Sequence, residues 1–190
     1  MEPIILVKIH QLDPRWSETK KDNYTKHVSR EYEIHRNVRH PRIVSLYDVF
    51  EIDSNSFATV LECCAGTDLD TTLKDEHHIP EKHARAILLQ ILSGMRYLTS
   101  SSDDGRRQGI IHFDLKPGNI LFDEFGDAKI TDFGLSKIVN AESPEDSMEL
   151  TSQGAGTYWY LPPECFITNE SVRIRYDVWA DLNLKCLGLN

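Results

Sequence analysis

The chain has 190 residues, of which 40% are hydrophobic and 27% charged, an ordinary composition for a soluble globular protein. Its formal net charge of −9 argues against binding to a nucleic-acid backbone, which requires a basic face. An acidic chain suits basic protein substrates, and it equally suits simple solubility. No apolar run approaches the ~20 residues of a membrane span, and no signal peptide is visible at the start. We therefore expect no nucleic-acid partner and no membrane.

The four cysteines are not spaced like zinc ligands, so we expect reduced thiols of an intracellular protein: Cys63, Cys64, Cys165 and Cys186. The apolar residues 4–9 predict a strand that carries Lys8. Residues 17–38 predict a helix ended by His40-Pro41, because one face repeats at steps of 4, 3, 4 and 3 through Tyr24, Val28, Glu31, His35 and Val38. Glu31 either reaches water at the edge of this face or needs a partner of opposite charge.

Two strands follow at residues 47–52 and 57–63, joined by a polar turn. Pro80 begins a second helix, whose apolar positions are Ile87, Ile91, Met95 and Leu98. Short apolar runs at 109–112 and 119–122 precede a strand at 128–131. Residues 132–164 predict a long loop, and the tail from Tyr176 predicts a helix. Strands early in the chain and helices later predict an α+β arrangement in two parts.

Three motifs carry the chemistry: residues 112–119 (His-Phe-Asp-Leu-Lys-Pro-Gly-Asn), 132–134 (Asp-Phe-Gly) and 162–164 (Pro-Pro-Glu). Singly, each residue has an ordinary structural explanation, such as a turn aspartate or a solvent-exposed lysine. Together and in this order, from about residue 7 to residue 179, they resemble the protein kinases. Residues 150–165 resemble the activation segment of the tousled-like serine/threonine kinases in particular. The resemblance implies a two-lobed kinase-like fold, with residues 1–62 in the N-terminal lobe and residues 63–190 in the C-terminal lobe.

The resemblance assigns the reaction to a few side chains. Asp114 would orient the substrate hydroxyl, and Lys116 would reach the transferring phosphate. Thr157 would contact the side chains of both Asp114 and Lys116. Lys8 would bind the α- and β-phosphates of ATP, held by an ion pair to Glu31. This ion pair would supply the partner that a carboxylate in the helix face requires.

The same resemblance assigns the cofactors, ATP and Mg²⁺. Asn119 and Asp132 would bind magnesium through oxygen atoms. Adenine would meet the hinge backbone at Glu62 and Cys64, with Leu61 as gatekeeper and Leu121 as floor of the pocket. Asp177 would anchor the catalytic loop.

The sequence departs from the kinase pattern in three places. Phe113 stands where many kinases have an arginine that receives an activation-loop phosphate, although an aromatic residue suits the tousled-like family. No glycine-rich loop precedes Lys8, so we expect the small lobe to lack its first two strands and that loop. Residues 181–190 do not resemble the family's continuation, so we expect the large lobe to lack its last helices. The coiled-coil oligomerisation region of tousled-like kinases is also not in this sequence.

Two functions follow from these observations. The first is phosphorylation of serine or threonine on protein substrates, which the resemblance places in the nucleus, with histone chaperones as substrates in chromatin assembly. The second is a catalytically impaired fragment that acts as a binding or decoy module, because positioning elements are expected to be missing. The presence of every expected catalytic residue favours the enzyme.

Overall fold

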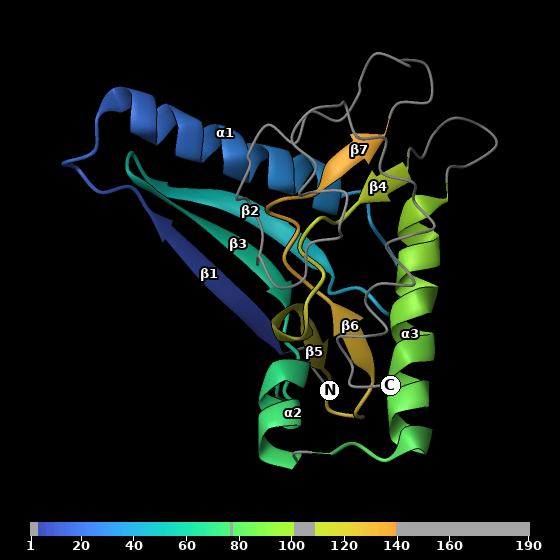
Figure 1. The fold of residues 1–190 in the computed structure, drawn as a ribbon. Coiled ribbons are helices and arrows are strands. Elements are labelled where there is room, and N and C mark those ends of the chain that lie inside the picture. Colours follow the sequence, from blue (N-terminus) through green and yellow to red (C-terminus); the bar gives the residue numbers. More distant parts are fainter. Residues whose placement is uncertain (1–3, 77, 101–108, 140–190) are drawn as a thin grey trace, which may run out of the picture.

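The computed structural model describes residues 4–76, 78–100 and 109–139 (Figure 1). In chain order the larger elements are β1 (Ile5–Gln11), α1 (Glu18–His35), β2 (Leu46–Asp53), β3 (Ser56–Glu62), α2 (Leu69–Glu76) and α3 (Glu81–Thr99). Short elements follow, namely β4 (Gly109–Ile111), the 3-10 helix η1 (Pro117–Asn119), β5 (Ile120–Phe122), β6 (Ala128–Ile130) and β7 (Lys137–Val139). The predicted α+β class is confirmed.

The first part is an antiparallel sheet with strand order β1-β3-β2. Helix α1 runs along one side of this sheet (Figure 1). The register places Lys8 opposite Thr59 on β3, and Leu61 opposite Leu46 on β2. Lys8 and Leu61 therefore occupy strands that pair directly, and both line one cavity with residues of α1.

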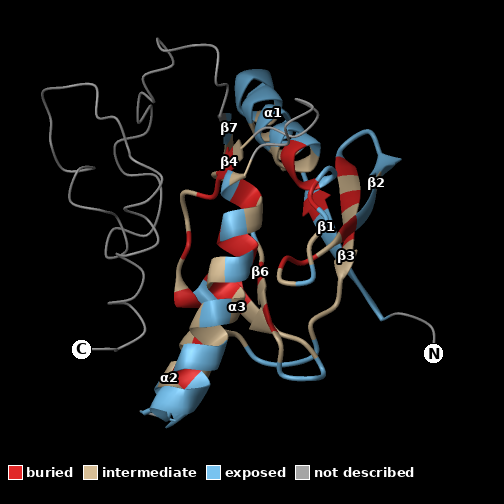
Figure 2. Ribbon diagram, turned by 90° about the vertical axis from the view of Figure 1, so that its right-hand side faces the viewer, coloured by how far each residue is buried: buried red, intermediate tan, exposed pale blue. Residues whose placement is uncertain are grey.

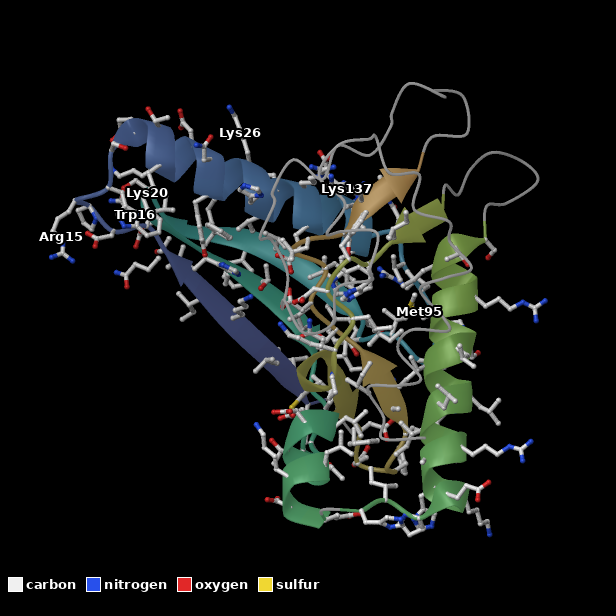
Figure 3. All side chains as sticks on the ribbon, in the orientation of Figure 1. Arg15, Trp16, Lys20, Lys26, Met95 and Lys137 are labelled. Atoms are coloured by element: carbon white, nitrogen blue, oxygen red, sulfur yellow. The ribbon has the colours of Figure 1, made fainter. Side chains whose placement is uncertain are left out.

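Helix α1 begins where the sequence predicts. Ser17 caps it, and its side chain accepts a hydrogen bond from the backbone N–H of Lys20 at 3.3 Å. The ammonium group of Lys20 lies 4.3 Å from the centre of the Trp16 ring, which braces this end of the helix (Figure 3).

The end of α1 differs from the prediction, because the helix stops at His35 and not at residue 38. The backbone N–H of Val38 bonds to the carbonyl of His35, so the chain already turns there. Val38 is nevertheless buried, at 2% exposed. Val38 thus continues the apolar pattern of α1 but is not helical. It reaches the same hydrophobic core from the turn that follows the helix.

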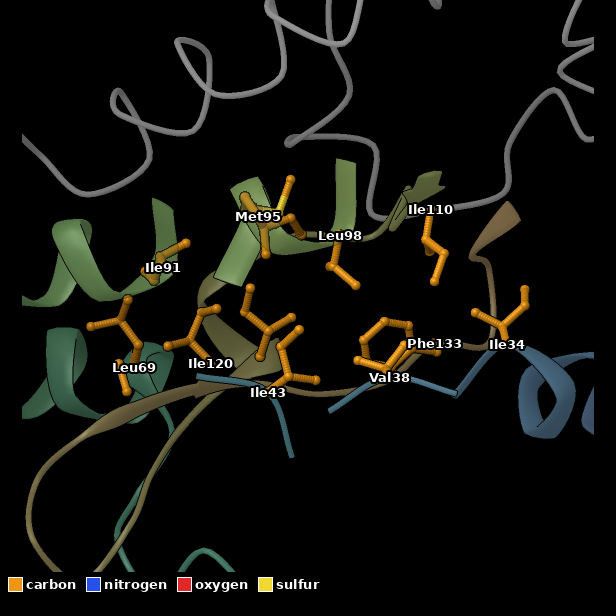
Figure 4. Close-up of a cluster of buried hydrophobic side chains, with 13 residues drawn as sticks. Ile34, Val38, Ile43, Leu69, Ile91, Met95, Leu98, Ile110, Ile120 and Phe133 are labelled. Carbon is orange, nitrogen blue, oxygen red and sulfur yellow. The ribbon is translucent and has the colours of Figure 1, made fainter. Parts of the chain in front are cut away.

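The second part is built on α3, which begins after Pro80 as predicted. One face of α3 is buried and the other is exposed (Figure 2). Its buried side chains join a hydrophobic cluster that also contains residues from the end of α1, from β5 and β6, and from the loop after β6 (Figure 4). The cluster includes Ile34, Ile43, Ile91, Met95, Leu98, Ile120 and Phe133.

Three elements were missed by the sequence analysis, namely α2, β7 and the three-residue 3-10 helix η1. Helix α2 has only 8 residues, of which only Leu69 is buried, so its apolar pattern is too short to detect; it starts where Asp68 accepts a hydrogen bond from the N–H of Thr71 at 2.9 Å. Strand β7 lies inside the predicted loop of residues 132–164, and this part of the prediction was wrong. A strand of three residues has too short a pattern to detect, and β7 exists because it pairs with β4. The helix predicted from Tyr176 lies outside the described residues.

The two parts are joined through the segment before β2. The N–H of Ile130 bonds to the carbonyl of Arg42, and the N–H of Val44 bonds to the carbonyl of Ile130, both at 2.9 Å. The Arg42 guanidinium also pairs with Asp127 at 2.8 Å. Residues 42–44 therefore belong structurally to β6, although they lead into the sheet. No helix within the described ranges is long and apolar enough to cross a membrane.

Candidate active site

His112 anchors the first motif in the interior. Its ring is 1% exposed, and Nε2 lies 3.0 Å from the carbonyl of Thr131. Nδ1 accepts a hydrogen bond from the backbone N–H of Asp114 at 3.3 Å. Burial lowers the pKa of His112, which keeps the ring neutral and able to accept that bond. His112 thus holds two segments together, one on each side of the site.

Asp114 is the centre of a compact polar network. One of its carboxylate oxygens lies 2.8 Å from Nζ of Lys116 and 3.0 Å from Nδ2 of Asn119. The same Asn119 amide also donates to the Asp114 carbonyl at 2.8 Å. The 3-10 helix η1 brings Asn119 back toward Asp114, because its short turn starts directly after Lys116. The structure therefore brings these three predicted residues together.

Two non-glycine residues near this network have a left-handed backbone conformation. They are Phe113, with φ of 64°, and Asp132, with φ of 67°. Such a conformation costs about 1–3 kcal/mol, and it persists only where the surroundings impose it. His112, which precedes Phe113, and Phe133, which follows Asp132, are both buried and hold these two residues in place. The strain falls on the two residues that flank or carry the predicted catalytic groups.

Phe133 fixes the second motif in the core. It is 0% exposed, and its ring centre lies 4.6 Å from that of His35 and 5.1 Å from that of His112. His35 is also buried, with Nε2 at 2.6 Å from the carbonyl of Val44, and burial lowers its pKa. These ring contacts, one tilted and one edge-on, connect α1, the loop of residues 112–119 and the Asp132 turn. The position of Asp132 therefore depends on the packing of α1.

Lys8 and Glu31 face a small cavity between α1 and the sheet. The cavity is lined by Lys8, Val28, Glu31, Tyr32, His35, Leu46, Thr59 and Leu61. Burial raises the pKa of the Glu31 carboxyl, the charge of Lys8 lowers it, and the charge of Asp132 raises it. Among the ion pairs within 4.0 Å in the described residues, none joins Lys8 to Glu31. The structure places both in one cavity without closing the expected pair.

Glu31 lies instead beside the Asp132 turn. A Cβ atom placed on Gly134 would stand 3.3 Å from Oδ1 of Asp132 and 3.6 Å from Oε2 of Glu31. A glycine here thus leaves room for two carboxylates to approach the same turn. Two negative charges at this point favour a cationic group between them, either the Lys8 ammonium or a metal ion.

The predicted hinge follows β3 and runs beside β5. The N–H of Gly66 donates to the carbonyl of Phe122 at 2.9 Å, and Asp68 forms a bridge with Leu121. Leu121 therefore lies next to the segment that leaves the hinge. Burial is the main cause that raises the pKa of Cys64 to about 11, so this thiol is protonated at neutral pH.

Sequence reasoning missed Lys129. Its ammonium group pairs with Oε1 of Glu62 at 2.7 Å, and the two side chains are only 11% and 20% exposed. A lysine between the buried residues Ala128 and Ile130 was the available signal, because such a residue lies on the opposite face of the strand.

The donor set fits magnesium. Mg²⁺ takes oxygen ligands, usually one or two from the protein with the rest from phosphates and water. The N–H of Thr131 bonds to the Asn119 carbonyl at 3.0 Å, which brings Asn119 close to Asp132 in space. In the described part of the chain, no group of three or more His, Cys, Asp and Glu residues gathers as a metal cluster. Thr157, Asp177, Cys165 and Cys186 lie outside the described residues.

The fold and this arrangement of side chains define a protein kinase core. The protein kinase domain family model matches residues 6–181, and the chain belongs to that family. It is 55% identical over 178 residues to the serine/threonine-protein kinase TOUSLED of Arabidopsis thaliana, an alignment that covers 93% of this chain and 25% of that protein. It is 52% identical over 184 residues to tousled-like 2 of Homo sapiens, covering 93% and 23% respectively. The chain spans about a quarter of the length of these curated relatives. The predicted resemblance is confirmed.

Proposed function

We propose that this chain transfers the γ-phosphoryl group of ATP to serine or threonine hydroxyls of protein substrates. The observation that carries the proposal is the network in which Lys116 and Asn119 both contact the Asp114 carboxylate, at 2.8 and 3.0 Å. Phosphoryl transfer requires mainly positioning and compensation of charge, and these side chains supply both.

Each residue of the network has a distinct task. The Asp114 carboxylate, oriented by Asn119, accepts a hydrogen bond from the substrate hydroxyl and receives its proton as the phosphate bond forms. Lys116 is placed by the same carboxylate and offsets negative charge on the transferring group. Its lysine identity matches serine/threonine kinases, by resemblance. Thr157 would contact both Asp114 and Lys116, as the family pattern suggests.

The nucleotide would lie between the sheet and the β5–β6 hairpin. Lys8 would hold its phosphates, and Glu31, which lines the same cavity, would pair with Lys8. Leu61, Leu121 and the backbone of Glu62 and Cys64 would surround adenine. Asn119 and Asp132 would hold Mg²⁺, which neutralises charge on the phosphates when bound. The N-terminal lobe would then comprise residues 1–62 and the C-terminal lobe residues 63–190.

The cellular role is proposed from similarity to relatives. Identity of 52–55% to tousled-like kinases supports the same substrate class. By resemblance, we propose a nuclear role in chromatin assembly, with histone chaperones among the protein substrates.

A radiolabelled-phosphate transfer assay tests the proposal. The chain is incubated with Mg²⁺, ATP and a basic acceptor protein, in parallel with Asp114→Asn, which preserves shape but removes the carboxylate. Label that enters serine or threonine with the parent chain and not with the variant supports the proposal. Absence of transfer by a folded parent chain would reject it and favour the non-catalytic binding module.

A further inference from the structure

The carboxylate of Glu62 is held by both of its oxygens. Oε1 lies 2.7 Å from Nζ of Lys129, and Oε2 accepts the backbone N–H of Ser45 at 3.0 Å. The backbone N–H of Glu62 also donates to the carbonyl of Ser45 at 2.9 Å. The first residue of the hinge is therefore bound to two other segments through its side chain and its backbone.

Both segments are connected to strand β6. Lys129 lies in the middle of β6, and Ser45 directly follows the segment 42–44, which is hydrogen-bonded to Ile130 of β6 on both sides. In the Lys129–Glu62 pair both side chains are shielded, whereas the Lys74–Asp70 pair, for example, is 73% and 40% exposed. Such exposed pairs contribute little, whereas a shielded pair with additional hydrogen bonds restricts motion.

The geometry also connects this pair to the floor of the nucleotide pocket. Lys129 is the direct cross-strand partner of Leu121 in the β5–β6 hairpin. Opposed residues of two antiparallel strands project from the same face of the sheet. Lys129 therefore links the hinge to the face of the hairpin that carries Leu121.

The electrostatics agree with a tight contact. Burial by itself raises the pKa of the Glu62 carboxyl, but hydrogen bonds from Lys129 and Ser45 outweigh it and lower the pKa overall. Removing Lys129 would leave a shielded carboxylate with one partner fewer. The carboxylate would then turn toward water, and the hinge backbone would move with it.

We propose that Lys129 is a positioning residue that, through Glu62, fixes the hinge backbone against Leu121 and thereby sets the affinity for adenine over other bases. This inference rests on the proposed function, because it concerns the same nucleotide site. Lys129 acts through Glu62, and its task is to hold two backbone groups of the hinge at a fixed distance from the pocket floor.

The test compares ATP with GTP, which share the triphosphate and differ in the base. Dissociation constants for both magnesium nucleotides are measured on the full chain for the parent, Lys129→Met, Lys129→Arg and the surface control Lys74→Met. We expect Lys129→Met to weaken ATP binding by about three- to tenfold, the range of one lost neutral hydrogen bond such as that between adenine and the hinge backbone, and to weaken GTP binding by less. The ratio of the dissociation constant for GTP to that for ATP therefore falls. Lys129→Arg, which keeps the charge, and Lys74→Met should match the parent.

The steady-state kinetics give an independent readout. In Lys129→Met, KM for ATP should rise while kcat stays within about twofold, because the hinge orients the base and not the reacting phosphate. A purely structural role predicts a lower unfolding midpoint and equal losses for ATP and GTP, a result that would overturn the inference. If Lys129→Met does not fold, Glu62→Gln, which retains the hinge backbone, carries the same expectation.

Failure of this inference can be distinguished from failure of the proposed function. A folded parent chain that binds neither nucleotide rejects the proposed function and this inference with it. A parent that prefers ATP, with an unchanged preference in Lys129→Met, rejects the positioning role alone.

Discussion

Gly66 lies where the chain leaves β3 and passes beside β5. A Cβ atom at this position would stand 2.8 Å from the carbonyl oxygen of Phe122 and 2.9 Å from its Cβ atom. Ordinary contacts between such atoms begin near 3.4 Å, so Gly66→Ala forces the two backbones apart by about 0.6 Å. The hydrogen bond from the Gly66 N–H to the same carbonyl, now 2.9 Å long, must stretch as well.

The expected cost follows from these distances. Overpacking against a rigid neighbour costs about 1–3 kcal/mol. Replacement of glycine by alanine regains about 0.4–1 kcal/mol by restricting the unfolded chain. We therefore expect Gly66→Ala to lower the free energy of unfolding by up to about 2.6 kcal/mol, and by about 1–3 kcal/mol relative to a glycine-to-alanine change without a clash. It should also weaken ATP binding, because the hinge moves away from the pocket floor.

Urea unfolding followed by fluorescence measures this effect, with Gly118→Ala as the matched control. A Cβ atom at Gly118 meets no atom within 4 Å, so the same substitution there adds no clash. The control should leave stability unchanged or raise it by up to about 1 kcal/mol. If Gly66→Ala proved as stable as Gly118→Ala, the contact between the hinge exit and β5 would not be as close as described, and the reasoning would fail.

Three further predictions concern the core and the catalytic loop. Leu98 is 1% exposed, so Leu98→Ala should lower the free energy of unfolding, measured by urea titration, by about 2–5 kcal/mol. Leu89 on the same helix is 58% exposed, so the control Leu89→Ala should change it by under about 0.5 kcal/mol. Burial holds the pKa of His112 below its ordinary value of 6.5, so the unfolded state binds the proton more readily. Stability should therefore decline as pH falls below about 6.5, level off below the folded-state pKa, and decline less in His112→Gln; equal slopes in the two proteins would contradict this. Asn119→Ala should reduce kcat by about a hundredfold in transfer assays, because Asp114 loses an orienting amide at 3.0 Å; a change under threefold would argue against that role.

Much of the fold could be predicted because its periodicities are strong. Strand β1, helix α3 and the β2–β3 pair carry continuous apolar patterns, and Ser17 and Pro80 mark helix starts through local chemistry. Helix α2 and β7 could not be predicted, because one is capped by Asp68 with a single buried residue and the other exists only by pairing with β4.

The residue types at the site were determined by the sequence alone. The order of Asp114, Lys116, Asn119 and Asp132 matches the protein kinase motifs, whose residue types suit the demands of phosphoryl transfer on side-chain chemistry. The spacing of the motifs was sufficient to indicate the kinase family.

Tertiary structure decided how those residues meet. The pairing of Lys129 with Glu62 joins positions far apart in the chain, and no local pattern encodes it. The cavity that Lys8 shares with Glu31, and the approach of Glu31 to Gly134, likewise depend on how α1 packs against the sheet and the core. Sequence periodicity reports which face of an element is buried, whereas long-range contacts are selected by the packing of whole elements against one another.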